Sequence, residues 1–526
     1  MVEPSRPGAG VDVVIVGAGA AGSLAAARLA AAGKSVTVLE SGPAWTVQSL
    51  VSSQIWARRL KWGGPRVVLD GANPFGHSMA MGWGLGGAAL HHYANWPRLR
   101  PEDFRLKTLY GRGADWPISY EELRPWYDLI QGEIGISGDA EAEVWRPPGA
   151  PYSQPPFPTF PQAETIAKGF AARGLRTAPA PLAILTEPKG DRAPCLFDGW
   201  CDAGCPTGAL ANPLVTYQKD AVRLGARFLS GCTVTRVNLD GRGRAAGVAF
   251  VDAKGEQRTL EAAVVILAAS AIQTPRLLLA SAGPGAERGV ANSSGLVGQG
   301  FMAHALTSFM GIFDTPQDNH LGVSGGNLVC RDGWEKTRVP GGFGSREWVI
   351  ASSLKPNDLI GIAMSRPDLF GQRLHAFMRD DAPRIAHMGA LFEPLPLPQN
   401  RIELATQKDA YGVPMARLTY ALAPETLALV EDAKIEGVAI MKAAGAKAVW
   451  TSPIVTNHAL GGTPMGSSPA DSVTDSYGRT WDAPNLFIYG GGLFPTAGAA
   501  GPTFTIHAVT RRAVDHLIDT WKAATA

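Results

Sequence analysis

A short segment, CLFDGWCDAGCPTG at 195–208, holds three of the five cysteines in the chain. Cys195, Cys201 and Cys205 follow the spacing C-x5-C-x3-C. Thiolates bind soft metals, and an iron–sulfur centre with three cysteine ligands would use all of them. Three thiols cannot pair as disulfides without leaving one over. The spacing alone also allows a zinc site with a fourth ligand, such as Asp202 or a distant histidine, and a reduced structural loop.

A second group of residues with chemical meaning lies near the N-terminus, where Gly17, Gly19 and Gly22 form the pattern G-x-G-x-x-G. Glycines at these positions allow a tight turn and a close approach of backbone to a pyrophosphate, and the following helix offers free N–H groups. Glu40 has the spacing of an acid that accepts hydrogen bonds from an adenosine ribose. The pattern predicts a dinucleotide site without separating NAD from FAD. A plain βαβ unit with a glycine-rich turn is the alternative.

The elements that would position these glycines can be predicted from the flanking residues. Residues 11–16 form a continuous apolar run, as expected for a strand buried on both faces. An alanine-rich helix follows, Gly33 ends it, and a second strand ends at Glu40. Apolar alternation at 229–267 predicts further strands, and a helix is expected after Pro502.

Composition limits the class of protein. The chain has 526 residues, of which 45% are hydrophobic and 18% charged, and its formal net charge is +2. These values predict a globular protein with more than one domain and no nucleic-acid partner. The longest apolar run, at 262–272, is too short for a transmembrane segment, and the N-terminal residues do not read as an export signal.

Longer motifs resemble the glucose–methanol–choline (GMC) family of FAD oxidoreductases. The first three are GWGLGGAALHHYANWPR at 82–98, DWPISYEELRPWYDLIQGEIGISG at 115–138 and VVILAASAIQTPRLLLAS at 264–281. The C-terminal part adds NHALGGTPMG from Asn457 and NLFIYGGGLFPTAGAAGPTFTIHAV from Asn485. The resemblance comes from the order of the motifs, and it implies FAD as the cofactor.

The fold implied by this resemblance is α/β (α+β overall). It combines a Rossmann-type FAD-binding domain with a substrate domain built on a largely antiparallel β-sheet with helices. The FAD-binding domain is expected to be discontinuous, with residues 1–95, 190–300 and 451–526. Residues 96–189 and 301–450 are expected to form the substrate-binding or cap domain.

The resemblance also assigns further residues to FAD binding, namely Gly86, Gly87, Val234, Gly490, Gly491, Pro502 and Thr503. The first two would sit at the flavin, Val234 at the adenine, and the later glycines near the pyrophosphate. A helix that begins at Thr503 would direct its positive end toward the flavin ring.

His91 lies where pyranose oxidases, which belong to this family, attach FAD covalently to a histidine. Many relatives keep a histidine nearby without a bond to the flavin, and the adjacent His92 leaves the register ambiguous. Covalent and non-covalent FAD therefore both stay open, because geometry rather than spacing decides such chemistry.

Alcohol oxidation by a flavin needs a base for the hydroxyl proton while hydride moves to flavin N5, and histidine suits this role. His458 matches the catalytic histidine of the family, and Asn457 would bind the substrate or orient the ring. Relatives place a second His or Asn just before the Pro-Thr of the last helix, where this chain has Gly501. His507 is one substitute; a packed helix histidine is the reading that we favour.

The three cysteines resemble those of bacterial FAD-dependent glucose dehydrogenase catalytic subunits, and fructose and gluconate dehydrogenases share the general layout. This likeness implies that Cys195, Cys201 and Cys205 hold a [3Fe–4S] cluster. A cytochrome or quinone would be the electron acceptor, and a small subunit would carry the export signal. We therefore expect the periplasmic face of the inner membrane if the chain is exported with that partner, and the cytoplasm otherwise.

These observations predict an FAD-dependent dehydrogenase that oxidises a hydroxyl of a sugar, polyol or related alcohol to a carbonyl. The alternative enzyme is an O2-reducing sugar or glycoside oxidase of the pyranose type, without a cluster. A flavin-binding structural protein is a reading from a different class, suggested by Gly501. The particular substrate and hydroxyl are not given by the sequence.

Overall fold

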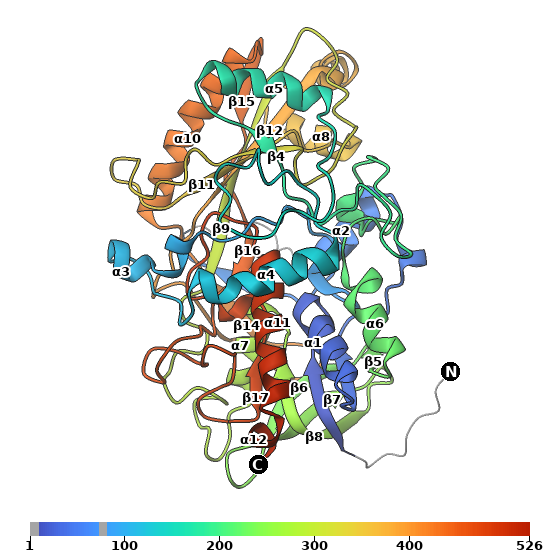
Figure 1. Ribbon diagram of the computed structural model, residues 1–526, viewed down its shortest axis with the longest axis vertical. Coiled ribbons are helices and arrows are strands. Elements are labelled where there is room, and N and C mark those ends of the chain that lie inside the picture. The colour runs from blue at the N-terminus through green and yellow to red at the C-terminus, as the bar shows by residue number, and fades with distance from the viewer. Residues whose placement is uncertain (1–9, 73–80) are drawn as a thin grey trace.

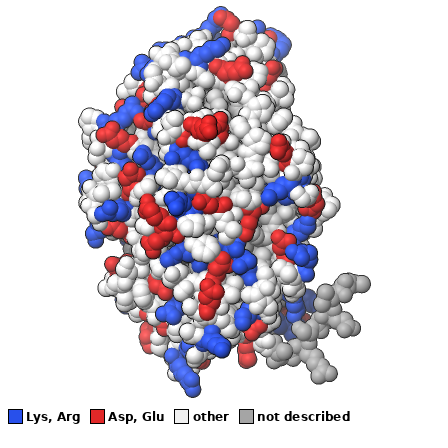
Figure 2. Space-filling model, viewed as in Figure 1, with Lys and Arg blue, Asp and Glu red and all other residues white. Residues whose placement is uncertain are grey.

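The structure is a computed structural model that describes residues 10–72 and 81–526. The molecule is elongated, and a β-sheet lies in each of its two halves (Figure 1). On the face in Figure 2, Lys and Arg are interspersed with Asp and Glu, without a large area of one sign.

The first sheet contains the predicted βαβ unit, formed by β1 (Val11–Val16), α1 (Ala20–Ala31) and β2 (Val36–Glu40). Its other strands are β5 (Arg227–Ser230), β6 (Thr233–Leu239), β7 (Ala245–Val251), β8 (Gln257–Leu267) and β17 (Leu486–Ile488). The order is β5-β2-β1-β8-β7-β6, and β17 also pairs with β8. The C-terminal part of β8 runs parallel to β1 and β17, whereas its N-terminal part is antiparallel to β7. This is the Rossmann-type arrangement that the glycine motif predicts.

Helices pack on this sheet and on one another. The helix α1 contacts α6 (Tyr217–Arg223) and α11 (Thr503–Asp519), and α11 contacts α4 (Tyr120–Ile134), as Figure 1 shows. Small residues dominate α1, and most of its side chains are buried. Because small side chains let backbones approach closely, the first turn of α1 lies directly beside the strand that precedes it.

The second sheet is antiparallel at every pairing between its strands, which confirms the expected substrate-domain sheet. Its strands are β4 (Ala178–Pro179), β9 (Met302–Ile312), β10 (Leu328–Cys330), β11 (Arg346–Ile350), β12 (Ile385–Phe392), β15 (Ala448–Thr451) and β16 (Val455–Leu460). The order is β15-β9-β12-β11-β10-β4, and β16 also pairs with β9. The helices α5 (Pro161–Ala172) and α10 (Pro424–Ala443) pack on this sheet.

The remaining strands, β3 (Val68–Asp70), β13 (Arg401–Lys408) and β14 (Pro414–Thr419), form a small third sheet. The remaining α-helices are α2 (Gln54–Trp62), α3 (Leu106–Tyr110), α7 (Ser270–Ala280), α8 (Pro356–Met364), α9 (Gln372–Ala376) and α12 (Trp521–Thr525). Within the described ranges, no helix is both long and apolar enough to cross a membrane.

The two large sheets have separate apolar cores. One cluster of buried side chains surrounds β1, β2, β8 and α11, and another surrounds β9, β11, β12 and α10. Strands β16 and β3 cross the predicted domain limits. β16 lies within residues 451–526 but pairs with β9 of the second sheet, and β3 lies within residues 1–95 but pairs with β14. The other limits stay a prediction.

Candidate active site

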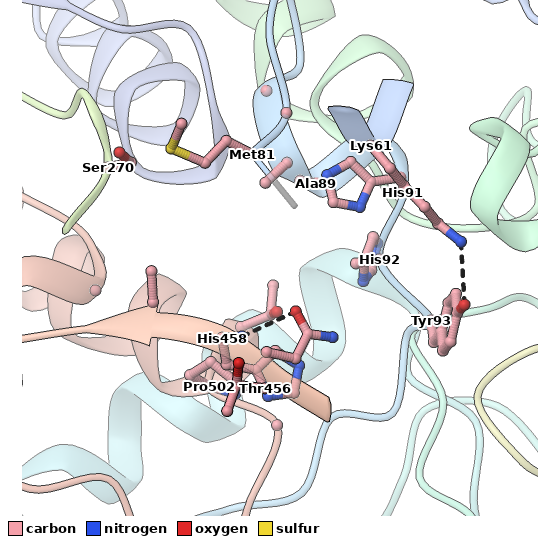
Figure 3. A pocket seen from close by; sticks show the side chains of 18 of the residues that line it. Lys61, Met81, Ala89, His91, His92, Tyr93, Ser270, Thr456, His458 and Pro502 are labelled. Carbon is pink, nitrogen blue, oxygen red and sulfur yellow. Dashed lines mark hydrogen bonds between the residues drawn. The ribbon is translucent and has the colours of Figure 1, made fainter. Parts of the chain in front are cut away.

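A cavity of about 1390 Å³ lies between the two sheets and is lined by parts of the chain that are far apart in sequence. The β1–α1 turn, the segment that follows Met81, strands β9 and β12, strand β16 and the start of α11 all contribute to its wall. Ligand pockets usually measure about 300–1,000 Å³, so this cavity has room for a large cofactor and a small substrate. Figure 3 shows His91 and Met81 on one side of the space and His458 and Pro502 on the other.

The three glycines of the N-terminal motif make one end of this cavity. Gly17 has a φ of +102°, and a Cβ on it would lie 2.5 Å from the carbonyl oxygen of Ala268. A Cβ on Gly22 would lie 2.0 Å from the Gly17 carbonyl oxygen. Gly17 and Gly19 line the cavity, whereas Gly22 allows α1 to pack against the turn. The backbone at Gly17 and Gly22 thus requires glycine, and the contact of this turn with a pyrophosphate stays a prediction.

The N-terminus of α1 faces the cavity and has no side-chain cap. Gly19 is its N-cap residue, and Gly19, Ala20 and Ala21 line the wall. The first N–H groups of a helix lack intrahelical partners and carry a partial positive charge, so they form a natural phosphate site.

Glu40 ends β2 and lines the cavity, but its carboxylate already has several partners. It accepts hydrogen bonds from the backbone N–H groups of Ala18 (3.0 Å), Gly42 (2.8 Å) and Gly84 (3.1 Å). Burial raises the pKa of this carboxyl, and the three N–H donors oppose that rise. The carboxylate therefore joins three turns around the dinucleotide end, a role that sequence spacing does not reveal. Its contact with a ribose stays a prediction.

Of the other glycines predicted to contact FAD, Gly87, Gly490 and Gly491 line the same cavity, whereas Gly86 lies beside it and faces Leu90. Gly86 and Gly87 have φ values of +96° and +55°, and a Cβ on Gly87 would lie 2.9 Å from the Gly19 Cα. Gly490, with a φ of +110°, also lies beside the start of α1, since a Cβ on it would be 3.7 Å from the Ala21 Cβ. Two backbone segments thus meet without side chains between them, which leaves their N–H groups close to any bound ligand.

The remaining residues assigned to FAD also line the cavity. They are Val234 on β6, and Pro502 and Thr503 at the first turn of α11. No side chain caps α11, and its first turn lines the cavity, so the positive end of this helix faces the cavity. Its direction toward the flavin ring stays a prediction. The cavity wall formed by Gly17, Gly19, Gly87, Gly490 and Gly491, the uncapped N-termini of α1 and α11, and the cavity volume are together suited to FAD.

His91 and His92 differ in what their ring nitrogens contact. Nε2 of His92 lies 2.8 Å from the Ala211 carbonyl oxygen, and Nδ1 accepts from the Ala94 N–H at 3.2 Å. Among the described residues, the buried Nε2 of His91 has no hydrogen-bond partner. Burial, and next the charge of Lys61, lower the pKa of His91 to about 3, so its ring is neutral at neutral pH. His92 therefore has a structural role, whereas His91 has an unpartnered ring nitrogen and lines the cavity.

Asn457 and His458 lie on β16, and both line the cavity. The Asn457 Oδ1 accepts the backbone N–H of His458 at 2.9 Å, and His458 has a φ of +61°. Burial, and next the neighbouring His304, lower the pKa of His458 to about 3. A neutral imidazole at the cavity wall can accept a proton from a substrate hydroxyl.

Gly501 lines the cavity, and there is no space for the His or Asn that the family pattern places there. A Cβ on Gly501 would lie 2.6 Å from the Asn95 carbonyl oxygen. The backbone of residues 95–97 therefore occupies the volume that a side chain would need. His507 is buried, and its Nδ1 lies 2.7 Å from the Thr503 carbonyl oxygen while its ring packs on Trp96. His507 does not line the cavity, so it does not replace the missing group.

We expect that restoring the family residue with Gly501→Asn does not improve alcohol-driven flavin reduction. The new Cβ must displace the backbone at Asn95, which should lower the free energy of unfolding by about 1–3 kcal/mol. Urea unfolding followed by flavin fluorescence measures this loss. Gly132→Asn, at an exposed position with nothing within 4 Å of the new Cβ, is the matched control. A faster, fully stable Gly501→Asn variant would contradict the steric argument.

The sulfurs of Cys195, Cys201 and Cys205 all accept hydrogen bonds from backbone N–H groups. The donors are Phe197 (3.3 Å), Ser324 (3.4 Å) and Leu210 (3.3 Å), respectively. Burial raises the pKa of the Cys201 thiol and raises that of Cys195 to about 12, so without a metal both stay protonated. N–H donors to sulfur stabilise thiolate ligands and tune iron–sulfur clusters.

The chain turns sharply around these sulfurs. Phe197, Gly199, Gly204 and Cys205 all have φ values between +55° and +89°. The charge of each thiolate would raise the pKa of its neighbours, since the pKa of Cys195 is raised in part by Cys205 and that of Cys201 in part by Cys205 and Cys195. Among residues 10–72 and 81–526, however, no group of three His, Cys, Asp or Glu side chains is gathered closely enough to hold one metal ion. A single zinc ion needs such close ligands, whereas a cluster holds its cysteines on separate irons.

The cysteine loop is attached to the cavity wall at two points. Ser324, whose N–H bonds to the Cys201 sulfur, itself lines the cavity. Asp202, next to Cys201, forms a 2.6 Å ion pair with Lys61, which lines the cavity beside His91. The loop and the expected flavin site are therefore neighbours.

Several residues at the far end of the cavity were not predicted from the sequence. Asn95 donates to the Glu347 Oε1 at 2.7 Å, and Glu347 also accepts from Arg331 at 2.7 Å. Within the part of the chain that the structure describes, the buried Asn95 Oδ1 and His387 Nδ1 have no hydrogen-bond partner. No sequence motif marks Asn95 or Glu347 as a site residue, and the two are 252 residues apart in the chain. Only the folded structure brings them together.

The fold and this site define a flavin-dependent oxidoreductase. Comparison with known proteins agrees, because two profiles described as GMC oxidoreductase match residues 159–306 and 396–510. A profile of an NAD(P)-binding Rossmann-like domain matches residues 15–63. The chain belongs to the GMC oxidoreductase family, and it is an FAD-dependent enzyme that acts on CH–OH groups.

Two curated relatives match almost the whole chain. The 2-methyl-1,2-propanediol dehydrogenase of Mycolicibacterium austroafricanum is 30% identical, over 96% of this chain and 95% of its own length. The fructose dehydrogenase large subunit of Gluconobacter japonicus is 30% identical, over 97% and 98%. The crystal structure of pyridoxine 4-oxidase from Mesorbium loti shares the fold, with a TM-score of 0.66 and 17% identity over 96% of this chain and 99% of that one.

Proposed function

We propose that the protein is a dehydrogenase that oxidises a hydroxyl of a sugar, polyol or related alcohol to a carbonyl, with a [3Fe–4S] cluster on Cys195, Cys201 and Cys205 as the electron exit. The observation that carries this proposal is the cysteine loop. Its three sulfurs accept backbone N–H donors, and it adjoins the wall of the flavin cavity. A cluster in this place could take electrons from the flavin and pass them on one at a time.

Each group at the cavity has a defined task in this reaction. When bound, FAD accepts the hydride that leaves the alcohol carbon. The neutral His458 takes the hydroxyl proton, and the exposed Asn457 beside it can bond the substrate oxygen. The uncapped N-terminus of α11 favours negative charge near Thr503.

Polar groups at the far end of the cavity support a polyhydroxylated substrate. Asn95 Oδ1, which is an acceptor, and a ring nitrogen of His387, Nδ1, are buried and have no partner among the described residues. A buried polar atom without a partner costs free energy, so a ligand hydroxyl that bonds there would gain affinity and orientation. The fructose dehydrogenase relative is consistent with a sugar-like donor.

The rest of the electron path follows from the same proposal. A cluster passes single electrons, so we propose a cytochrome or quinone as the acceptor, and a small signal-bearing partner subunit that directs the enzyme to the periplasmic side of the inner membrane. The relative named as a large subunit supports a partner chain.

A second candidate is an O2-reducing sugar or glycoside oxidase without a cluster. It is favoured by the absence, among the described residues, of a close group of three metal-ligating side chains. Iron and acid-labile sulfide per flavin, measured on anaerobically purified protein together with an EPR spectrum, separate the two. About three irons per flavin with an oxidised-cluster signal supports the dehydrogenase. Iron-free protein that consumes dioxygen with a sugar rejects it.

We also propose that FAD is attached covalently through His91, whose Nε2 has no other partner among the described residues. The flavin should then stay with the polypeptide after acid precipitation and move with it on a denaturing gel. His91→Ala should release all of the flavin into the supernatant, whereas the exposed His375→Ala should release none. Free flavin from the unaltered protein would mean that His91 only contacts the ring.

A further inference from the structure

A second histidine, His304, lies directly behind His458. It belongs to β9, its side chain is completely buried, and it does not line the cavity. The Nδ1 atoms of the two rings are 3.3 Å apart, and the ring planes are inclined at 83°. Nε2 of His304 lies 2.9 Å from the carbonyl oxygen of Gly498.

An irregularity in the β9–β16 pairing brings these rings together. Asn457 stands opposite His304, but Leu460 stands opposite Met302, so β16 contains one extra residue between these pairs. Side chains alternate along a regular strand, which would turn His458 away from the face that carries His304. His458 instead adopts a left-handed φ of +61°, as in a β-bulge that re-aims a side chain.

The hydrogen bonds determine where the protons lie on these rings. A backbone carbonyl can only accept, so the Nε2 of His304 must carry a hydrogen. Burial lowers the pKa of His304 to about 4, so the ring is neutral and its Nδ1 is a bare acceptor. The hydrogen in the bond between the two rings must then belong to Nδ1 of His458, which leaves Nε2 of His458 with a lone pair.

We propose that His304 is a positioning residue that holds His458 in the Nδ1–H tautomer, so that Nε2 is the atom that takes the alcohol proton. The inference rests on the base role proposed above for His458. In that step the O–H bond of the alcohol breaks and its proton forms a new Nε2–H bond. His458 becomes a cation whose Nδ1–H remains bonded to His304, while the carbon gives its hydride to the flavin.

The Gly498 carbonyl that sets the tautomer belongs to the loop that leads into α11. Gly498 has a φ of +61°, and a Cβ on it would lie 2.9 Å from both Asp103 Oδ2 and Leu99 Cδ2. The backbone there is therefore closely packed and cannot shift easily. The contacts therefore run without a break from the Gly498 carbonyl through the buried His304 ring to His458 at the cavity wall.

Histidine tautomers can be read directly by NMR on the FAD-loaded protein labelled with ¹⁵N-histidine. In a neutral ring, long-range couplings from the ring protons tell which nitrogen carries hydrogen. The His458 signals are identified as those lost in His458→Gln. We expect Nδ1–H for His458 and Nε2–H for His304, and an Nε2–H tautomer at His458 would overturn the proposal.

Variants of His304 test the same point through kinetics. His304→Leu removes the acceptor, so the rate of flavin reduction at saturating alcohol should fall by about 10–100-fold with little change in the alcohol concentration for half-saturation. His304→Asn, which keeps an oxygen acceptor near the position of Nδ1, should recover much of the rate. Equal loss in both variants would indicate a packing role only. The NMR spectrum of the wild-type protein requires no turnover, so it tests the positioning role of His304 separately from the base role of His458.

Discussion

His458→Ala is expected to keep FAD bound but to slow alcohol-driven bleaching of the flavin by at least about 10²-fold, the scale of one positioned base. The side chain lines the cavity at β16, and it is not among the atoms found closest to a Cβ on Gly17, Gly19, Gly87 or Gly490 in the described part of the chain. Its loss therefore removes the proton acceptor and leaves the dinucleotide end intact. Anaerobic stopped-flow absorbance of the flavin measures the rate.

Two comparisons make this result specific. His375→Ala removes an exposed histidine from α9 and should bleach at the wild-type rate. The visible spectrum of His458→Ala before substrate is added should match that of the wild type, since FAD binding is unchanged. Bleaching within a factor of about two of the wild type would remove His458 from the mechanism.

Cys201→Ala is expected to abolish the cluster and, with it, turnover with a one-electron acceptor, by about 10²-fold or more. Three thiolates are needed for three irons, and the Cys201 sulfur is the one bonded to the cavity-lining Ser324. Alcohol should still bleach the flavin, because the proton acceptor and the dinucleotide end do not include this residue. Iron content, bleaching rate and steady-state reduction of an artificial acceptor are measured on the same sample.

Cys330→Ala is the matched control for this change. Cys330 is a buried free cysteine on β10, outside the sequence segment of the loop, and its loss should alter neither iron content nor acceptor reduction. If Cys201→Ala retained its iron and its acceptor turnover, the cysteine loop would be structural and the oxidase reading would lead. A parallel loss of bleaching and of acceptor turnover would mean that the loop supports the flavin site itself.

The dinucleotide end could be predicted from sequence because its signals are local. The strand at Val11–Val16, the glycine turn and the acid at Glu40 all lie within thirty residues, and the structure has the same strand limits. Local backbone geometry requires glycine at positions such as Gly17, where a Cβ would meet backbone. The antiparallel second sheet was predicted from the family resemblance rather than from periodicity.

The rest of the site depends on contacts between distant segments. From the sequence, His304 lies in an apolar segment and is interpreted as a core residue. Its contact with His458 becomes visible only in the pairing of β16 with β9. The reason for Gly501 is the Asn95 carbonyl, about four hundred residues earlier in the chain. The hydrogen-bond donors to Glu40 are the backbone N–H groups of Ala18, Gly42 and Gly84, which no residue pattern identifies.

Strand β9 carries both His304 and, on the same face, Leu306, Ser308 and Met310, which line the cavity. Side chains two residues apart on a strand share a face, so the register of β9 fixes the position of His304 and of this part of the cavity wall together. Substrate range can therefore diversify through exchanges at Ser308 and Met310 while the register at His304 is kept. A deletion of a single residue would turn the whole face away from the cavity. The cavity-lining positions of β9 can therefore change in residue type, whereas the length of the strand must be kept.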